Sequence, residues 1–155
     1  MGGSLFGIAK MATNLQPVVL VIDPDALTLM GLSATLHHQG LEVHGARTPM
    51  AAARAARDLP LDLVIVDGWI DDSRGLDTLA QLRGLSHLLD LPGIFLWDGG
   101  VPAPALPVAA FSLAKPLDLE ALASVVTRAL WLPHLTHQPM AVPSCKFLQT
   151  RTIRV

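Results

Sequence analysis

Apolar runs recur along the chain and predict the strands of a sheet. Five runs are rich in branched or other apolar residues: 17–22, 41–46, 61–67, 94–97 and 110–114. The run Leu61 to Asp67 shows no clean alternation of polar and apolar positions. This pattern is typical of a strand covered on both faces, as in a parallel sheet between layers of helices. We therefore interpret 61–67 as the central strand.

Segments with helical spacing separate these strands. Leucines recur from Leu29 until Gly40, a plausible glycine just beyond a helix end, and Thr48-Pro49 predicts the start of a helix that closes near Asp58. Two more helices are predicted over about 75–89, with N-cap candidates Asp71, Asp72 and Ser73, and from the N-cap Asp118 to 132. The alternation predicts an α/β fold: a doubly wound, five-stranded parallel sheet.

One crossover breaks the pattern. Residues 98–109 contain Gly99, Gly100, Pro102, Pro104 and Pro107. A regular helix interior does not accommodate prolines at this spacing. We predict an irregular loop where the fourth helix of such a fold is expected.

The chain divides into three parts by composition. We expect a flexible leader over 1–16, one domain over 17–132 and a C-terminal tail over 133–155, where prolines at 133, 139 and 143 end the helical pattern. The length of 155 residues suits a single domain of ordinary size.

Charge and cysteine content narrow the class of protein. The formal net charge is −2, with 15% charged residues, so electrostatics give no reason to expect a nucleic-acid partner. The single cysteine, Cys145, excludes an internal disulfide framework and fits a reducing compartment. No apolar run approaches the roughly 20 residues of a membrane helix. We expect a soluble cytoplasmic protein that does not enter a membrane.

Charged residues stand where three of the predicted strands end: Asp23, Asp67 and Lys115. Carboxyl ends of parallel strands share one sheet edge, and neighbours lie about 4.8 Å apart, so these side chains are expected to converge. A carboxylate that attacks a phosphoryl group needs nearby positive charge from a lysine or Mg²⁺. At an effective dielectric of 20, opposite charges 4 Å apart attract by roughly 4 kcal/mol before desolvation.

This ordered set, together with Gly75-Leu76 eight residues after Asp67 and Pro116 after Lys115, resembles the receiver domain of bacterial response regulators, a flavodoxin-like architecture. The resemblance implies that Asp67 accepts a phosphoryl group from a histidine kinase or phosphotransfer protein. It implies that Lys115 contacts the phosphoryl oxygens. Mg²⁺ would be held by Asp23, Asp67 and the backbone carbonyl of Trp69.

The resemblance also implies how such a protein acts. It would be a single-domain signalling protein in a two-component phosphorelay, without catalytic residues of an enzyme, that binds an unknown downstream protein. The sequence leaves open whether it forms a homodimer. The tail is too short for an output domain.

Three positions depart from the family pattern. Pro24 stands at the second acidic position and has no side-chain oxygen, while Asp25 is expected to point along the following helix. A purely structural interpretation makes Asp23 the N-cap and Pro24 the first helical residue. Trp97 stands where the family places a hydroxyl, and Ser112 stands near its switch aromatic.

These departures keep two alternatives open. One is a pseudo-receiver, an interaction module whose partner binding ignores phosphate. The other follows from Asp23-Pro24-Asp25, which resembles the Asp-x-Asp start of haloacid-dehalogenase-type phosphatases, with Asp23 as nucleophile. The chain lacks the late glycine-rich acidic motif expected of that family.

Overall fold

The computed structural model describes residues 16–70, 73–100, 102 and 104–137. Apart from Gln16, the predicted leader lies outside these residues, and so do Asp71, Asp72 and the part of the tail that includes Cys145. No helix of the described chain is long and apolar enough to cross a membrane.

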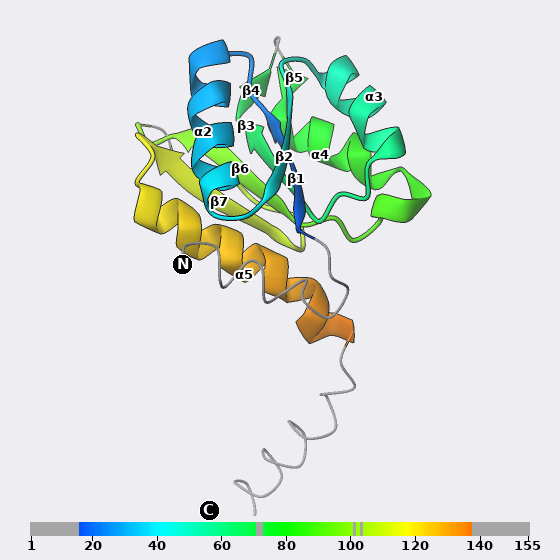
Figure 1. The fold of residues 1–155 in the computed structure, drawn as a ribbon. Helices are drawn as coiled ribbons and strands as arrows, with labels where there is room; N and C mark the ends of the chain where they lie inside the picture. Colours follow the sequence, from blue (N-terminus) through cyan, green and yellow to red (C-terminus); the bar gives the residue numbers. More distant parts are fainter. Residues whose placement is uncertain (1–15, 71–72, 101, 103, 138–155) are drawn as a thin grey trace, which may run out of the picture.

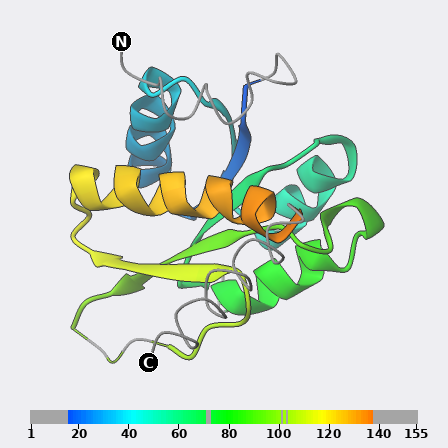
Figure 2. The same ribbon diagram turned by 90° about the horizontal axis from the view of Figure 1, so that it is seen from below.

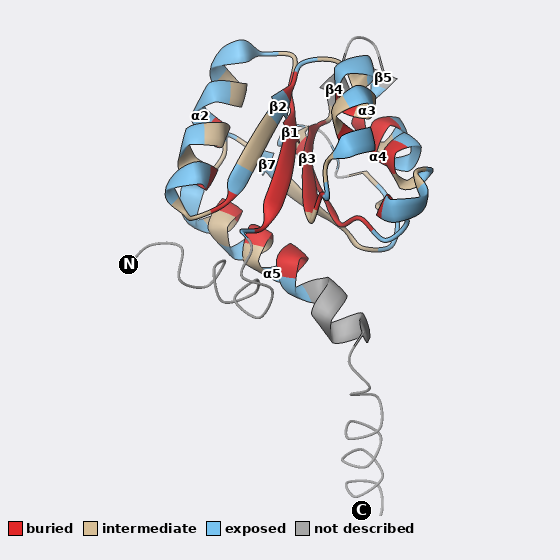
Figure 3. Ribbon diagram, turned by 45° about the vertical axis from the view of Figure 1, so that its right-hand side comes forward, coloured by how far each residue is buried: buried red, intermediate tan, exposed pale blue. Residues whose placement is uncertain are grey.

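A five-stranded parallel sheet forms the centre of the molecule (Figure 1). The strand order is β2-β1-β3-β6-β7. The strands are β1 (Val18–Ile22), β2 (Glu42–Ala46), β3 (Leu63–Asp67), β6 (Gly93–Asp98) and β7 (Ala110–Lys115). The predicted doubly wound α/β fold is confirmed, with β1 and β3 buried throughout as expected for central strands (Figure 3).

Helices cover both faces of the sheet (Figures 1 and 2). α2 (Ala26–His38) and α5 (Leu119–His137) pack on one face with Ile65, Ile94 and Leu96. α3 (Pro49–Asp58) and α4 (Gly75–Arg83) pack on the other with Leu20 and Val64. Apolar side chains at alternate positions of a strand thus point to opposite faces of the sheet and pack in two separate core layers.

Several predicted helix ends are confirmed by their capping contacts. The N of Ala51 donates to Thr48 Oγ1 at the start of α3, and the N of Glu120 donates to Asp118 Oδ1 at the start of α5. Gly40 follows α2 with φ 88°, the left-handed conformation that glycine adopts without steric cost.

Three local predictions were wrong. The predicted helix over 75–89 ends at Arg83, because Gly84 caps it, and continues only as a short 3-10 turn, η1 (Ser86–Leu88). The predicted loop before it contains an antiparallel pair, β4 (Trp69–Ile70) and β5 (Ser73–Arg74). Arg74, not the predicted Ser73, is the N-cap of α4, and it makes no side-chain capping bond.

The last helix is longer than predicted. α5 continues through Pro133 to His137, where the sequence pattern indicated an end at Leu132. Proline removes one backbone donor, and the helix does not stop at that point.

The fourth crossover lacks a helix, as the prolines predicted. No helix occurs among the described residues between β6 and β7. The Ala109 backbone at its end has φ 58°, a conformation uncommon for residues other than glycine. β7, an edge strand of the sheet, is only partly buried along its length.

Candidate functional site

The carboxyl ends of β3 and β7 bring Asp67 and Lys115 together. The Nζ of Lys115 donates to Oδ1 of Asp67, and the two side chains form an ion pair. Asp67 is buried, whereas the Lys115 side chain is partly exposed. A lysine ammonium is carried on a flexible four-carbon stem. It can therefore shift and stay close to the carboxylate when an oxygen-bearing group is attached to that carboxylate.

Asp23, at the end of β1, is buried beside this pair, with 2% of its surface exposed. Its Oδ1 accepts a hydrogen bond from the N of Asp25 at 2.8 Å, while Oδ2 is buried without a partner among the described residues. Burial raises the pKa of Asp23, and the negative charge of Asp67 adds to this; the Asp25 N–H and Lys115 oppose it. This charge is therefore undercompensated and would gain from a cation.

The structural interpretation of Asp23 as a helix cap was wrong. Asp25 is the N-cap of α2 and accepts from the N and Oγ1 of Thr28 at 2.9 and 2.6 Å. The bond from the Thr28 hydroxyl, followed by that from its N–H, lowers the pKa of Asp25. Asp25 thus serves its own helix, as expected. Pro24 offers only its carbonyl, which accepts from Arg47 Nε and Nη2.

The residue eight positions after Asp67, Gly75, has no room for a side chain. Its N donates to the carbonyl of Gly68 at 3.0 Å. A Cβ at Gly75 would lie 2.1 Å from the Asp67 carbonyl oxygen and 2.8 Å from the Phe95 ring. The first turn of α4 therefore packs directly on the end of β3.

The remaining predicted positions lie around this centre. Trp69 opens β4 two residues after Asp67, and Ser112 stands opposite Phe95 in the sheet register. Trp97 is near the end of β6, opposite Ala114, and lines a pocket that Gly68 borders but that neither Asp67 nor Lys115 lines. No group of three or more His, Cys, Asp or Glu suited to a metal occurs among the residues that the structure describes.

Sequence reasoning missed two features of the β6–β7 half. One is the pocket beside Trp97, although the apolar alternation of Phe95 and Trp97 on one face of β6 signals it. The other is Arg83, whose Nε donates to Leu91 O at 2.8 Å and whose Nη2 donates to Ala109 O at 3.1 Å. Burial lowers the pKa of Arg83. Nothing in the sequence distinguishes this arginine from a solvated one at a helix end.

Known proteins resemble this chain in sequence or in fold. Transcriptional regulatory protein KdpE of Mycobacterium tuberculosis is 42% identical over 67 residues, which cover 43% of this chain and 30% of that protein. The chain thus spans less than a third of this curated relative. Among solved structures, the chemotaxis protein CheY4 of Vibrio cholerae superposes with TM-score 0.67 at 23% identity, covering 75% of this chain and all of CheY4. A two-component response regulator from Clostridium difficile gives 0.66 at 22% identity, covering 76% of this chain and 98% of that one.

The family comparison covers the part of the chain that carries the two buried aspartates. The model of the response regulator receiver domain matches residues 19–98, just over half of the chain. The match begins in β1 and ends with β6, where the irregular crossover starts. The chain belongs to the response regulator receiver domain family of two-component signalling.

Proposed function

We propose that this receiver accepts a phosphoryl group on Asp67 from a histidine kinase or phosphotransfer protein and then acts by binding a downstream protein. The contact between Asp67 and Lys115, beside the unpartnered oxygen of Asp23, carries this proposal. Receiver domains are in general signalling modules that interact with histidine kinases and effectors. The proposal extends that general role to these residues.

The step would convert a carboxylate into an acyl phosphate. An Asp67 oxygen bonds to phosphorus as the phosphorus–nitrogen bond of a phosphohistidine breaks, and the electron pair leaves on the imidazole nitrogen, which takes up a proton. Charge accumulates on the phosphoryl oxygens during this transfer. The ammonium of Lys115 is placed to neutralise part of it.

Receiver domains typically bind Mg²⁺ at this site, and the residues present fit a reduced ligand set. Asp23 Oδ2 is buried without a partner among the described residues, Asp67 adds a second carboxylate, and Trp69 can offer its backbone carbonyl. Pro24 offers no side-chain oxygen, and Asp25 is bound to Thr28. Water would supply the remaining oxygen ligands. When bound, Mg²⁺ neutralises the carboxylates and the incoming oxyanions.

Phosphorylation is tested with the full chain, Mg²⁺ and a small phosphodonor such as acetyl phosphate. We expect an acid-stable, base-labile adduct of one phosphoryl group in the intact mass spectrum. Asp67→Asn should remove the adduct, whereas Asp77→Asn, an exposed position in the first turn of α4, should retain it. Removing Mg²⁺ with a chelator should slow formation. Absence of an adduct with both acetyl phosphate and a cognate kinase would refute the proposal.

A phosphorylation-independent pseudo-receiver is the second candidate. The observation that favours it is the diversion of Asp25 to Thr28, together with an indole at Trp97 where a hydroxyl would contact the phosphoryl group. In that case Asp67→Asn should leave partner binding unchanged. Loss of partner binding in a folded Asp67→Asn variant would rule this candidate out.

The phosphatase alternative has less support. Its general acid would be Asp25, which caps α2, and its nucleophile Asp23 is almost completely buried. We expect no turnover of p-nitrophenyl phosphate. Turnover that Asp23→Asn abolishes would reverse this ranking.

A further inference from the structure

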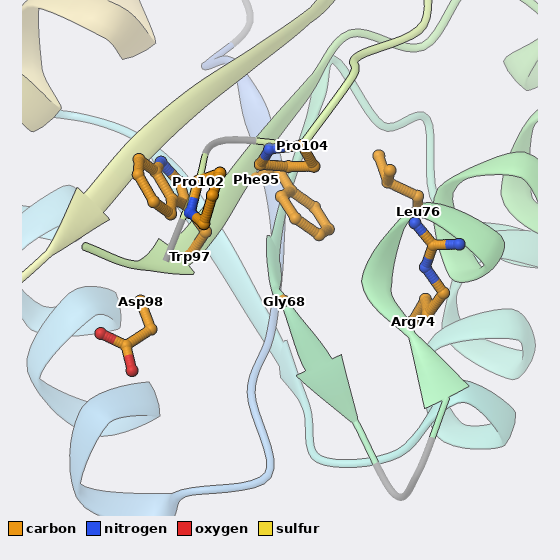
Figure 4. Close-up of a pocket in the computed structure, with 8 residues that line it drawn as sticks. All are labelled: Gly68, Arg74, Leu76, Phe95, Trp97, Asp98, Pro102 and Pro104. Carbon is orange, nitrogen blue, oxygen red and sulfur yellow. The ribbon is translucent and has the colours of Figure 1, made fainter. Parts of the chain in front are cut away.

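A pocket of about 260 Å³ opens beside β6, on the α3–α4 side of the sheet (Figure 4). Ile94 and Leu96 belong to the core on the α2–α5 side, so the alternate residues Phe95 and Trp97 face the opposite side. The pocket lies between the start of α4 and the crossover that lacks a helix. Its lining residues are Gly68, Arg74, Leu76, Phe95, Trp97, Asp98, Pro102 and Pro104.

The walls of this pocket are mostly apolar and include two aromatic rings and two prolines. Figure 4 shows the Trp97 indole beside the ring of Pro102, and Pro104 beside the Phe95 ring, with Leu76 across from them. Prolines and aromatic rings give flat, rigid surfaces with little side-chain freedom to lose on binding. Such a slot suits a flat apolar ligand.

Two charged side chains, those of Asp98 and Arg74, border the slot. Asp98 Oδ1 accepts from the N of Gly100 at 3.0 Å, and its carboxylate points away from the rings (Figure 4). Arg74 is exposed, and its side chain makes neither a hydrogen bond nor an ion pair with another described residue. A guanidinium presents a planar fork that matches a carboxylate. The ligand should therefore carry one negative group.

The volume sets the size of the apolar part. An interior cavity of roughly 150 Å³ accommodates one benzene molecule. A pocket of about 260 Å³ therefore has room for one more fused ring.

We propose that this pocket binds a bicyclic aromatic carboxylate, with the rings between Leu76 and Trp97 and the carboxylate on Arg74. The binding does not require phosphorylation of Asp67, so the two proposals succeed or fail separately. Gly68 lines the pocket directly after Asp67, so a bound ligand lies next to the phosphoacceptor candidate.

Calorimetric titration of the full chain with 2-naphthoate tests the proposal. We expect saturable binding with a dissociation constant of about 1 mM or tighter. Leu76→Trp should fill the slot and abolish binding, and Trp97→Ala should weaken it. Arg74→Gln should weaken 2-naphthoate about tenfold and leave the neutral 2-naphthalenemethanol unchanged. Arg54→Gln, at an exposed position of α3, is the matched control and should have no effect.

Three outcomes would overturn the proposal. They are no saturable binding of 2-naphthoate up to about 10 mM, unchanged binding in Leu76→Trp, and equal weakening by Arg74→Gln and Arg54→Gln. Circular dichroism checks that each variant is folded. If Trp97→Ala does not fold, Leu76→Trp and Arg74→Gln still decide the question, because both change only the rim.

Discussion

The half of the sheet formed by β2, β1 and β3 differs from the half formed by β6 and β7 in how its strands are connected and in the residues that end them. β1 and β3 are buried throughout, are joined to their neighbours through helices, and end on Asp23 and Asp67. β7 is partly exposed along its length and follows a crossover without a helix. This second half contributes Lys115 to the ion pair with Asp67, and the resemblance implies that Trp97 stands at the position of the family hydroxyl.

The difference separates two sets of residues that a receiver normally combines. The charged groups of the proposed phosphoryl-transfer site are buried or paired: Asp23 and Asp67 are buried, and Lys115 forms an ion pair with Asp67. The resemblance implies that Trp97 and Ser112, both in the second half, stand in place of the residues that respond to the phosphoryl group. The proposed phosphorylation of Asp67 therefore does not depend on those two positions.

In the first half, α4 packs closely on the end of β3 at Gly75. We expect Gly75→Ala to lower the free energy of unfolding by about 3 kcal/mol or more, because its Cβ would overlap the Asp67 carbonyl and force a backbone shift. Gly31→Ala is the matched control. No atom lies within 4 Å of its Cβ position, and alanine favours the α2 helix, so a gain of about 0.5–1 kcal/mol is expected. Urea denaturation measures both; equal effects would contradict the packing described here.

In the second half, Arg83 joins the end of α4 to the turn before β6 and to the residue before β7, because its Nε donates to Leu91 O and its Nη2 donates to Ala109 O. We expect Arg83→Ala to cost about 2 kcal/mol, since two partly buried carbonyls lose a charged donor. Arg83→Lys should recover only part of this, because one ammonium does not reproduce the guanidinium fork. Arg54→Ala should be nearly neutral. A neutral Arg83→Ala in thermal unfolding would show that the crossover is anchored elsewhere.

Within the first half, Asp23 and Asp25 should differ in how they affect stability as pH changes, because their pKa values shift in opposite directions. The pKa of Asp23 is raised in the folded protein, so ionisation of this carboxyl lowers the free energy of unfolding. This loss is absent at a pH below the unfolded-state pKa near 3.8 and complete at a pH above the folded-state pKa. We expect Asp23→Asn to stabilise the protein at pH 7 and to have little effect at a pH below the unfolded value near 3.8.

The lowered pKa of Asp25 gives the opposite dependence. Its stabilising contribution is present above the unfolded value and is lost as pH falls through the folded pKa. Asp25→Asn should therefore destabilise α2 slightly at pH 7. Thermal unfolding from pH 3 to 8 measures both variants, and the same sign of effect at pH 7 would contradict the assigned environments.

Much of the first half could be predicted from sequence because local signals agree there. Apolar runs, Thr48-Pro49 and Gly40 each specify their element through near-neighbour physics, and the structure follows them. Asp23 is harder. Its role depends on a hydrogen bond that its Oδ1 accepts from the N of Asp25, and both aspartates are equally good caps by type.

The second half resists sequence analysis because its contacts are distant in the chain. The prolines of 98–109 predicted correctly that no helix occurs among the described residues between β6 and β7, but the absence of a helix does not say what fills the space. Arg83 reaches Ala109 across 26 positions, and the pocket joins Arg74 to Pro104. Neither relation leaves a periodic pattern. The candidate ligand site therefore appears only in three dimensions.

Replacing Trp97 by a residue with a hydroxyl tests the comparison between the halves with the smallest expected effect. If the charged site is intact and only the hydroxyl is missing, Trp97→Thr should place a hydroxyl that donates to a phosphoryl oxygen on Asp67, worth about 0.7 kcal/mol net. The phosphorylated fraction at subsaturating acetyl phosphate should then rise about threefold. The variant Trp97→Val controls for removal of the indole, because valine has the shape of threonine without the hydroxyl. An equal rise in both variants would assign the effect to access alone, and a rise in neither would mean that the position of Trp97 does not face the Asp67 site.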